Sequence, residues 1–125
     1  MANNSKPKLP KAVQNPEDAL FQAVSLCRKA GKLTLGYDAC CDAAFYGKAW
    51  LILAASDISP KTLEKLKGKV GDLVEVYTMP LTQERLLPVS RKTTAVYAVT
   101  DRGLARLILK KLSDCGIAMI EEDDE

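Results

Sequence analysis

The run 49–55 constrains the fold of this chain more than any other stretch. Its seven residues, Ala-Trp-Leu-Ile-Leu-Ala-Ala, are all apolar, so both faces of a strand made from them avoid water. Strands of this kind lie inside a sheet that helices cover on each side. Helix patterns precede the run at 37–46 and follow it from Ser59, and strands and helices go on alternating along the chain. The sequence therefore predicts an α/β fold, a three-layer α/β/α sandwich.

Capping residues mark where helices begin. Asn15, Ser59 and Asp101 can each accept a hydrogen bond from a free amide of a first helical turn. Pro16 and Pro60 follow two of them and suit the first helical position, where a missing N–H costs nothing. Apolar side chains recur at helical spacing after each cap. The predicted helices cover residues 16–30, 37–46, 60–70 and 102–115.

The remaining apolar stretches are predicted to be strands, at 32–35, 73–78 and 93–99. Between the last two, Thr82 is expected to cap a short helix. Pro88 should end that helix, because proline disrupts a helix interior. Two alternatives stay open for residues 117–120: an edge strand or a packed tail.

Length and charge predict the domain organisation. A chain of 125 residues supports one domain with a hydrophobic core. Residues 1–15 contain three lysines and no acid, and residues 117–125 contain five acids and no base. We therefore expect a flexible basic arm (1–15), a single domain (16–116) and an acidic tail (117–125). Without both ends the net charge is +4, which permits nucleic-acid binding.

Residue types limit the chemistry available. The chain has no histidine, which is the commonest general base, and its four cysteines form no CxxC pair. We therefore expect a protein that is not an enzyme and has no metal or cofactor. Cys40 is interpreted as a buried apolar residue, and the alternative is a low-pKa thiol near a helix start. The polar N-terminus and the lack of a long apolar run predict a cytoplasmic protein without a membrane partner. We expect a monomer.

The turn Leu33-Thr34-Leu35-Gly36 leads directly into the second helix. The first amides of a helix have no intrahelical acceptor, and the helix dipole makes that end positive. Such an end suits an anion, including the phosphate of a nucleic acid. The Gly36 turn is thus a candidate anion-binding feature.

Four stretches carry a resemblance to a known family: residues 26–33, 36–47, 51–60 and 96–103. In this order and spacing the chain resembles the kink-turn-binding ribosomal protein family, which includes the large-subunit proteins seven-Ae and thirty-e. It looks most like the small bacterial YlxQ-type members. The resemblance spans about residues 19–110 and implies a small mixed sheet at the centre of the sandwich.

The resemblance also implies an RNA-binding face made of residues 32–42, 56–59 and 89–93. A kink-turn is a sharply bent internal loop whose exposed bases a protein can contact. The expected function is non-catalytic RNA binding, with the protein associated with the ribosome or with another structured RNA. The candidate RNA-binding residues are Lys32, Gly36, Tyr37, Asp38, Arg91 and Lys92.

The second helix departs from the family pattern. The strongest RNA-binding members have a glycine, then an Asn-Glu pair and then a lysine, whereas this chain keeps Gly36 but has Asp38, Ala39 and Asp42. Asp38 and Asp42 are four residues apart, so they share one helix face and repel phosphate. The alternative hypothesis is a protein-interaction module on the same fold that has lost kink-turn binding.

Overall fold

Four short strands form one mixed sheet in the computed structural model, which describes residues 15–117. They are β2 (Leu33–Leu35), β3 (Leu51–Ala54), β4 (Val76–Thr78) and β5 (Val96–Val99), in the order β2-β5-β3-β4. β5 is antiparallel to both β2 and β3, and β4 is parallel to β3. Three strands therefore end where β5 begins. We call this the carboxyl end of the sheet, and the other the amino end.

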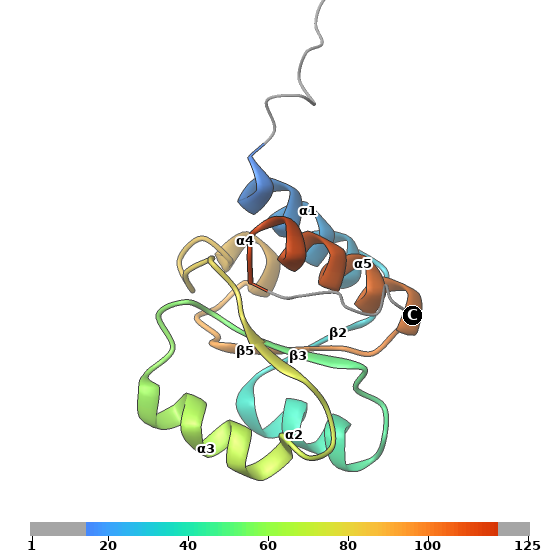
Figure 1. Cartoon of the computed structure of the whole chain (residues 1–125), viewed down its shortest axis with the longest axis vertical. Helices are drawn as coiled ribbons and strands as arrows, with labels where there is room; N and C mark the ends of the chain where they lie inside the picture. The colour runs from blue at the N-terminus through green and yellow to red at the C-terminus, as the bar shows by residue number, and fades with distance from the viewer. Residues whose placement is uncertain (1–14, 118–125) are drawn as a thin grey trace, which may run out of the picture.

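Helices cover both faces of the sheet (Figure 1). One layer contains α1 (Pro16–Lys29), α4 (Leu87–Ser90) and α5 (Arg102–Asp114), and the other contains α2 (Tyr37–Phe45) and α3 (Pro60–Val70). The chain is thus a three-layer α/β/α sandwich with a small mixed sheet. The predicted fold class is confirmed.

The side chains of β3 explain the layering, because successive residues of a strand point to opposite faces. Leu51 and Leu53 belong to the core under α1 and α5, whereas Ile52 and Ala54 belong to the core under α2 and α3. All four are buried. Burying one large aliphatic side chain contributes about 1.5–3 kcal/mol, so this run stabilises both layers at once.

The three predicted caps are confirmed. The Asn15 side chain accepts from the Glu17 amide at 2.7 Å, and Ser59 Oγ accepts from the Thr62 amide at 3.1 Å. At the start of α5, Asp101 Oδ2 accepts from the Leu104 amide at 2.9 Å. These local bonds fix the start of α1, α3 and α5.

The prediction for the segment after Thr82 was wrong. Thr82 Oγ1 does accept from the Arg85 amide at 3.1 Å, but residues 83–86 form only a turn. The short helix is α4, and it contains Pro88 instead of ending before it. Pro88 is tolerated there because it lies in the first turn, where its missing N–H has no intrahelical acceptor to lose.

Each strand is shorter than predicted, and β4 and β5 begin three residues later than expected. The amides of Leu73 and Val74 bond to Val70 O and continue the turn after α3, so β4 begins only at Val76. Side-chain hydroxyls of Ser90, Thr94 and Tyr97 hold the segment before Val96. The expectations for residues 1–14 and 118–125 lie outside the described residues; within them, Ile117 bonds to Leu112 O at the end of α5.

No helix among residues 15–117 is long and apolar enough to cross a membrane.

Candidate nucleic-acid interface

Three segments distant in sequence meet at the carboxyl end of the sheet. The Gly36 amide donates to Val96 O at 2.9 Å, which places the start of α2 beside the start of β5. On the other side of β5, the Ala55 amide donates to Ala95 O at 2.9 Å. The turn before α2, the loop after β3 and the loop before β5 therefore form one continuous surface, on the left in Figure 1.

Gly36 gives the start of α2 its geometry. Its backbone has φ 103° and ψ 149°, a conformation that is almost exclusive to glycine. Its carbonyl accepts the first helical bond, from the Cys40 amide at 2.9 Å. The amides before Cys40 thus precede the hydrogen-bonded body of α2, as an anion-binding helix start requires. Asp38 lies in this first turn and is exposed.

Hydroxyl groups fix the loop between α4 and β5. Ser90 Oγ donates to Lys92 O at 2.7 Å, and Thr94 Oγ1 donates to the same carbonyl at 3.2 Å. The Tyr97 hydroxyl donates to Thr94 O from within β5. All three hydroxyl residues are buried. They hold the loop backbone inward and leave the side chains of Arg91 and Lys92 exposed.

Tyr97 is suited to hold this loop across a wide pH range. Burial raises its pKa to about 12, with smaller contributions from the charges of Asp57 and Cys40. The hydroxyl therefore keeps its proton and stays a donor at neutral pH. Sequence reasoning missed Ser90, Thr94 and Tyr97; the only available signal was hydroxyl residues on both sides of a basic pair.

Arg91 follows α4 directly and adopts a left-handed conformation, with φ 71°. Residues other than glycine, asparagine and aspartate rarely adopt this backbone conformation, which costs them about 1–2 kcal/mol. Such strain is often retained at functional sites. The left-handed turn redirects the chain from α4 into the basic loop.

The loop after β3 is tied to the same end. The Ser56 amide donates to Leu81 O at 2.8 Å, and Asp57 Oδ1 accepts from the Gln83 amide at 3.0 Å. The Asp57 carboxylate thus organises the turn that leads towards α4. Because Ser59 also caps α3, every connection at the carboxyl end is held by a side-chain hydrogen bond or by a glycine.

The structure brings together four of the six candidate residues, Gly36, Asp38, Arg91 and Lys92, at the carboxyl end. Lys32 lies at the amino end, where its carbonyl accepts from the Thr100 amide at 3.0 Å. Tyr37 is partly buried among α2, α3 and the sheet, and Lys69 Nζ lies 5.7 Å from its ring centroid. Its hydroxyl is buried and has no hydrogen-bond partner among the described residues.

Cys40 is a core residue. It is fully buried, and its Sγ donates to Thr34 O at 3.4 Å. Burial, with a smaller contribution from Cys41, raises the Cys40 pKa to about 12. The interpretation as a buried apolar residue is confirmed, and the low-pKa alternative is wrong because desolvation outweighs the nearby helix start.

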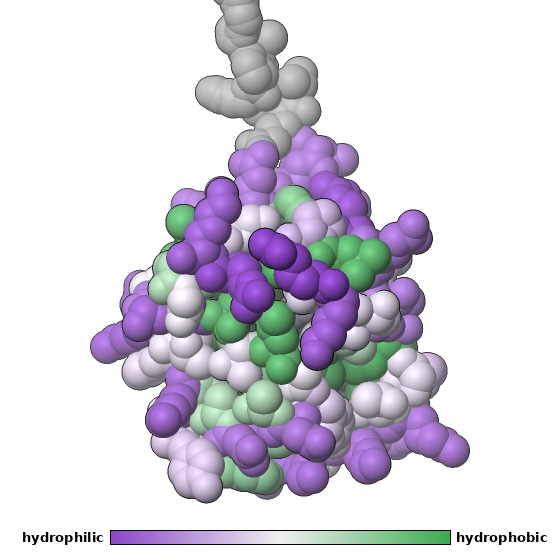
Figure 2. Space-filling view, turned by 180° about the vertical axis from the view of Figure 1, so that it is seen from behind, coloured by the Kyte–Doolittle hydropathy of each residue, from purple (hydrophilic) through white to green (hydrophobic). Residues whose placement is uncertain are grey.

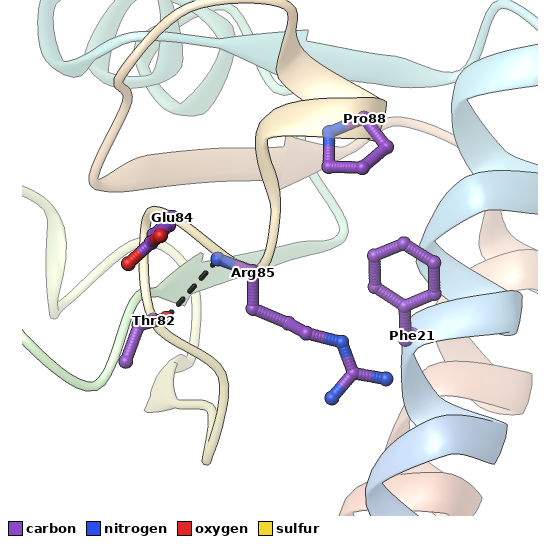
Figure 3. A pocket seen from close by; sticks show the side chains of 5 residues that line it. All are labelled: Phe21, Thr82, Glu84, Arg85 and Pro88. Carbon is purple, nitrogen blue, oxygen red and sulfur yellow. Dashed lines mark hydrogen bonds between the residues drawn. The ribbon is translucent and has the colours of Figure 1, made fainter.

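A shallow pocket lies beside this surface, between α1 and the segment 82–88 (Figure 3). Arg85 crosses it, with its guanidinium 4.9 Å from the Phe21 ring centroid. The same guanidinium pairs with Asp18 at 2.5 Å. Arg85 is therefore committed to α1, unlike Arg91 and Lys92. Among residues 15–117, no group of three or more His, Cys, Asp or Glu side chains could hold a metal ion.

Comparison with solved structures shows that the fold is shared. A protein of unknown function from Bacillus halodurans is similar with a TM-score of 0.66 and 23% identity, over 75% of this chain and 96% of that one. A 15.5 kD RNA-binding protein of Giardia lamblia is similar with a TM-score of 0.65 and 16% identity, over 81% of this chain and 88% of that one. No family model and no curated protein sequence matches this chain.

Proposed function

We propose that this protein binds structured RNA, without catalysis, through the carboxyl end of its sheet. The observation that carries the proposal is the convergence of the Gly36 helix start with the fixed Arg91–Lys92 loop. Both features suit phosphate. The helix start offers backbone amides, and the loop offers two exposed basic side chains on a fixed backbone. The likeness of the fold to a protein named as RNA-binding supports the same class of ligand.

The finer part of the proposal concerns the RNA. A bent internal loop such as a kink-turn exposes bases and phosphates that a regular helix hides. The carboxyl end offers cations at the start of β5 and acids, Asp38 and Asp57, towards α2 and α3. Such a divided surface selects RNA by the positions of its phosphates, because Asp38 repels any phosphate placed over it. Association with the ribosome in the cytoplasm would supply RNA of this kind.

The test is a gel-shift series with a kink-turn RNA and a straight duplex of equal length. The charge-reversal variant Arg91→Glu with Lys92→Glu should abolish the preference for the kink-turn. In a salt series, loss of two phosphate contacts should also lower the slope of log affinity against log salt by about 2. The matched control is Arg106→Glu with Lys110→Glu, two exposed positions of α5. Equal, negligible binding of the wild-type protein to both RNAs at low salt contradicts the proposal.

One observation favours a second function. Asp38 and Asp42 are both exposed on α2, so this helix presents acids where the proposed interface needs cations. A protein-interaction module would use that acidic face. Asp38→Asn with Asp42→Asn separates the two functions: it should tighten RNA binding if α2 borders the RNA, and leave it unchanged if α2 serves only a protein partner.

A further inference from the structure

The amino end of the sheet carries three exposed aromatic side chains within six residues. Phe45 is 51% exposed, Tyr46 76% and Trp50 52%. Phe45 is the last residue of α2, and Tyr46 and Trp50 belong to the connection from α2 to β3, which is on the right in Figure 1. Exposed aromatic side chains leave much of their hydrophobic contribution to stability unused, so a cluster of them suggests a ligand. We call residues 45–50 the aromatic loop.

Backbone bonds hold the aromatic loop in place. The Gly47 amide donates to Ala44 O at 3.1 Å, and the Lys48 amide donates to Ala43 O at 2.8 Å. Gly47 has φ 73°, so this is the glycine-dependent ending common for helices. The Trp50 amide then donates to Val99 O at 2.8 Å and joins the loop to the sheet. The aromatic rings are therefore presented from a fixed backbone.

Cations accompany these aromatic rings. The Arg102 guanidinium lies 5.7 Å from the Trp50 ring centroid, and Lys48 separates Tyr46 from Trp50 in sequence. Lys32 is close to them along the sheet, since its carbonyl bonds to Thr100, two residues before Arg102. Within residues 15–117 the only salt bridge joins Arg85 and Asp18, so none of these three cations is paired with a described carboxylate.

We propose that the aromatic loop, with Arg102 and Lys32, is a second RNA-binding surface that takes unpaired nucleotides. Aromatic rings stack on bases of any sequence, while neighbouring cations bind the phosphates between them. The core of a protein–protein interface is depleted of charged residues. Because Lys48 lies in the middle of the aromatic loop, RNA fits this surface better than a protein partner does. On the rear face, apolar side chains also form separate patches bordered by hydrophilic ones, without one continuous apolar area (Figure 2).

This proposal rests on RNA being the ligand, as proposed for the carboxyl end, but it uses different residues. β3 and β5 have four residues each, so the two surfaces are separated by a strand length of about 13 Å. A single strand that leaves a structured RNA at the carboxyl end could then reach the aromatic loop. The protein would bind a folded RNA element together with its unpaired flank.

Trp50 provides the measurement, because it is the only tryptophan of the chain. Titration with a ten-nucleotide oligouridine at low salt should quench Trp50 fluorescence to saturation, and added salt should reverse the quenching. Tyr46→Ala should weaken oligouridine binding at least about fivefold, since one stacked base contributes that much or more. Leu26→Ala, at a half-exposed position of α1, is the matched control and should bind as the wild type does. Circular dichroism checks that both variants are folded.

Three outcomes separate this proposal from its alternatives. Wild-type binding to a kink-turn without any response of Trp50 to oligouridine overturns the aromatic loop and leaves the carboxyl end intact. Quenching by oligouridine, with kink-turn binding unaffected by Arg91→Glu and Lys92→Glu, supports the aromatic loop and overturns the proposed interface at the carboxyl end. Removal of residues 118–125 tests a different occupant: if it shifts the Trp50 emission, while oligouridine quenches Trp50 in neither the full-length nor the shortened protein, the acidic segment occupies the loop and the proposal fails.

Discussion

The two ends of the sheet use similar residue types in opposite ways. At the carboxyl end the aromatic side chains face inward: Tyr97 holds the basic loop, and Tyr37 packs among α2, α3 and the sheet. At the amino end Tyr46 and Trp50 face outward, and a cation accompanies Trp50. An aromatic residue beside a basic one is therefore insufficient evidence of base stacking. The direction of the side chain, inward or outward, separates a tyrosine that supports the fold from one that is free to stack on a base.

The ends also differ in what holds them. Buried hydroxyls fix the basic loop at the carboxyl end, where Arg91 is strained, whereas the hydrogen bonds described above for the backbone of the aromatic loop all join main-chain atoms. Side-chain support can be removed by single substitutions without changing the rest of the sheet. The carboxyl end should therefore be the more easily damaged of the two.

The largest effect should come from alkaline pH, which acts on both ends together. Burial raises the pKa of Cys27 to about 11 and that of Cys40 to about 12, from the ordinary thiol value of 9.0. The folded state holds these protons more tightly than the unfolded state, so their stabilisation is complete below pH 9. It is lost as the pH rises from 9 to 12. Urea unfolding at a series of pH values should show this fall.

Cys40→Ala is the matched variant for the pH series. One thiol fewer then titrates, so the slope of unfolding free energy against pH, between pH 9.5 and 11, should decrease by up to about 1.4 kcal/mol per pH unit. An unchanged slope would mean that Cys40 is ionised at its ordinary pKa and is accessible to solvent. At any pH where this fall unfolds the sandwich, the two RNA surfaces should lose binding together.

Tyr97→Phe should separate the two ends. It removes the bond to the Thr94 carbonyl and leaves this buried acceptor unpaired, at a cost of about 1–3 kcal/mol. The loss falls on the loop that presents Arg91 and Lys92, so kink-turn binding should weaken while oligouridine still quenches Trp50. Thermal unfolding and the two RNA titrations measure these effects; equal weakening at both ends would refute the local role of Tyr97.

A pair of glycine substitutions compares the ends directly. Gly36→Ala and Gly47→Ala each place a methyl group in open space, so any cost comes from the positive φ alone. The Gly36 conformation is the less accessible to alanine, so its substitution should cost about 2 kcal/mol and that of Gly47 about 1 kcal/mol. Gly36→Ala should weaken kink-turn binding, and Gly47→Ala should weaken oligouridine binding. If Gly36→Ala weakened oligouridine binding and Gly47→Ala weakened kink-turn binding, the carboxyl end would bind unpaired nucleotides and the aromatic loop the kink-turn.

Local signals in the sequence account for what was predicted correctly. Asn15, Ser59 and Asp101 act on amides two or three residues away, and the burial of residues 51–54 follows from the apolar composition of run 49–55. Composition alone was wrong for Trp50, which lies before the strand and is exposed. The hydroxyl bonds around the basic loop span only two or three residues, but the sequence does not show that Ser90, Thr94 and Tyr97 turn inward, which is seen only in their burial in the folded sandwich. Lys32 and Gly36 flank a three-residue strand, so they lie at opposite ends of it although only three residues separate them.

The smallest effect should come from Arg91→Gly, and it should have opposite signs for stability and binding. Glycine adopts the left-handed conformation of residue 91 without strain, so the unfolding free energy should rise by about 0.5–1 kcal/mol. The same change removes one of the two exposed cations from the basic loop, so kink-turn binding should weaken and its salt slope should decrease by about 1. Lys92→Gly is the matched control, because residue 92 has no positive φ; it should weaken binding without raising stability. A stabilised Arg91→Gly protein that binds as tightly as the wild type would show that the strain at residue 91 serves the chain reversal after α4 and not the RNA.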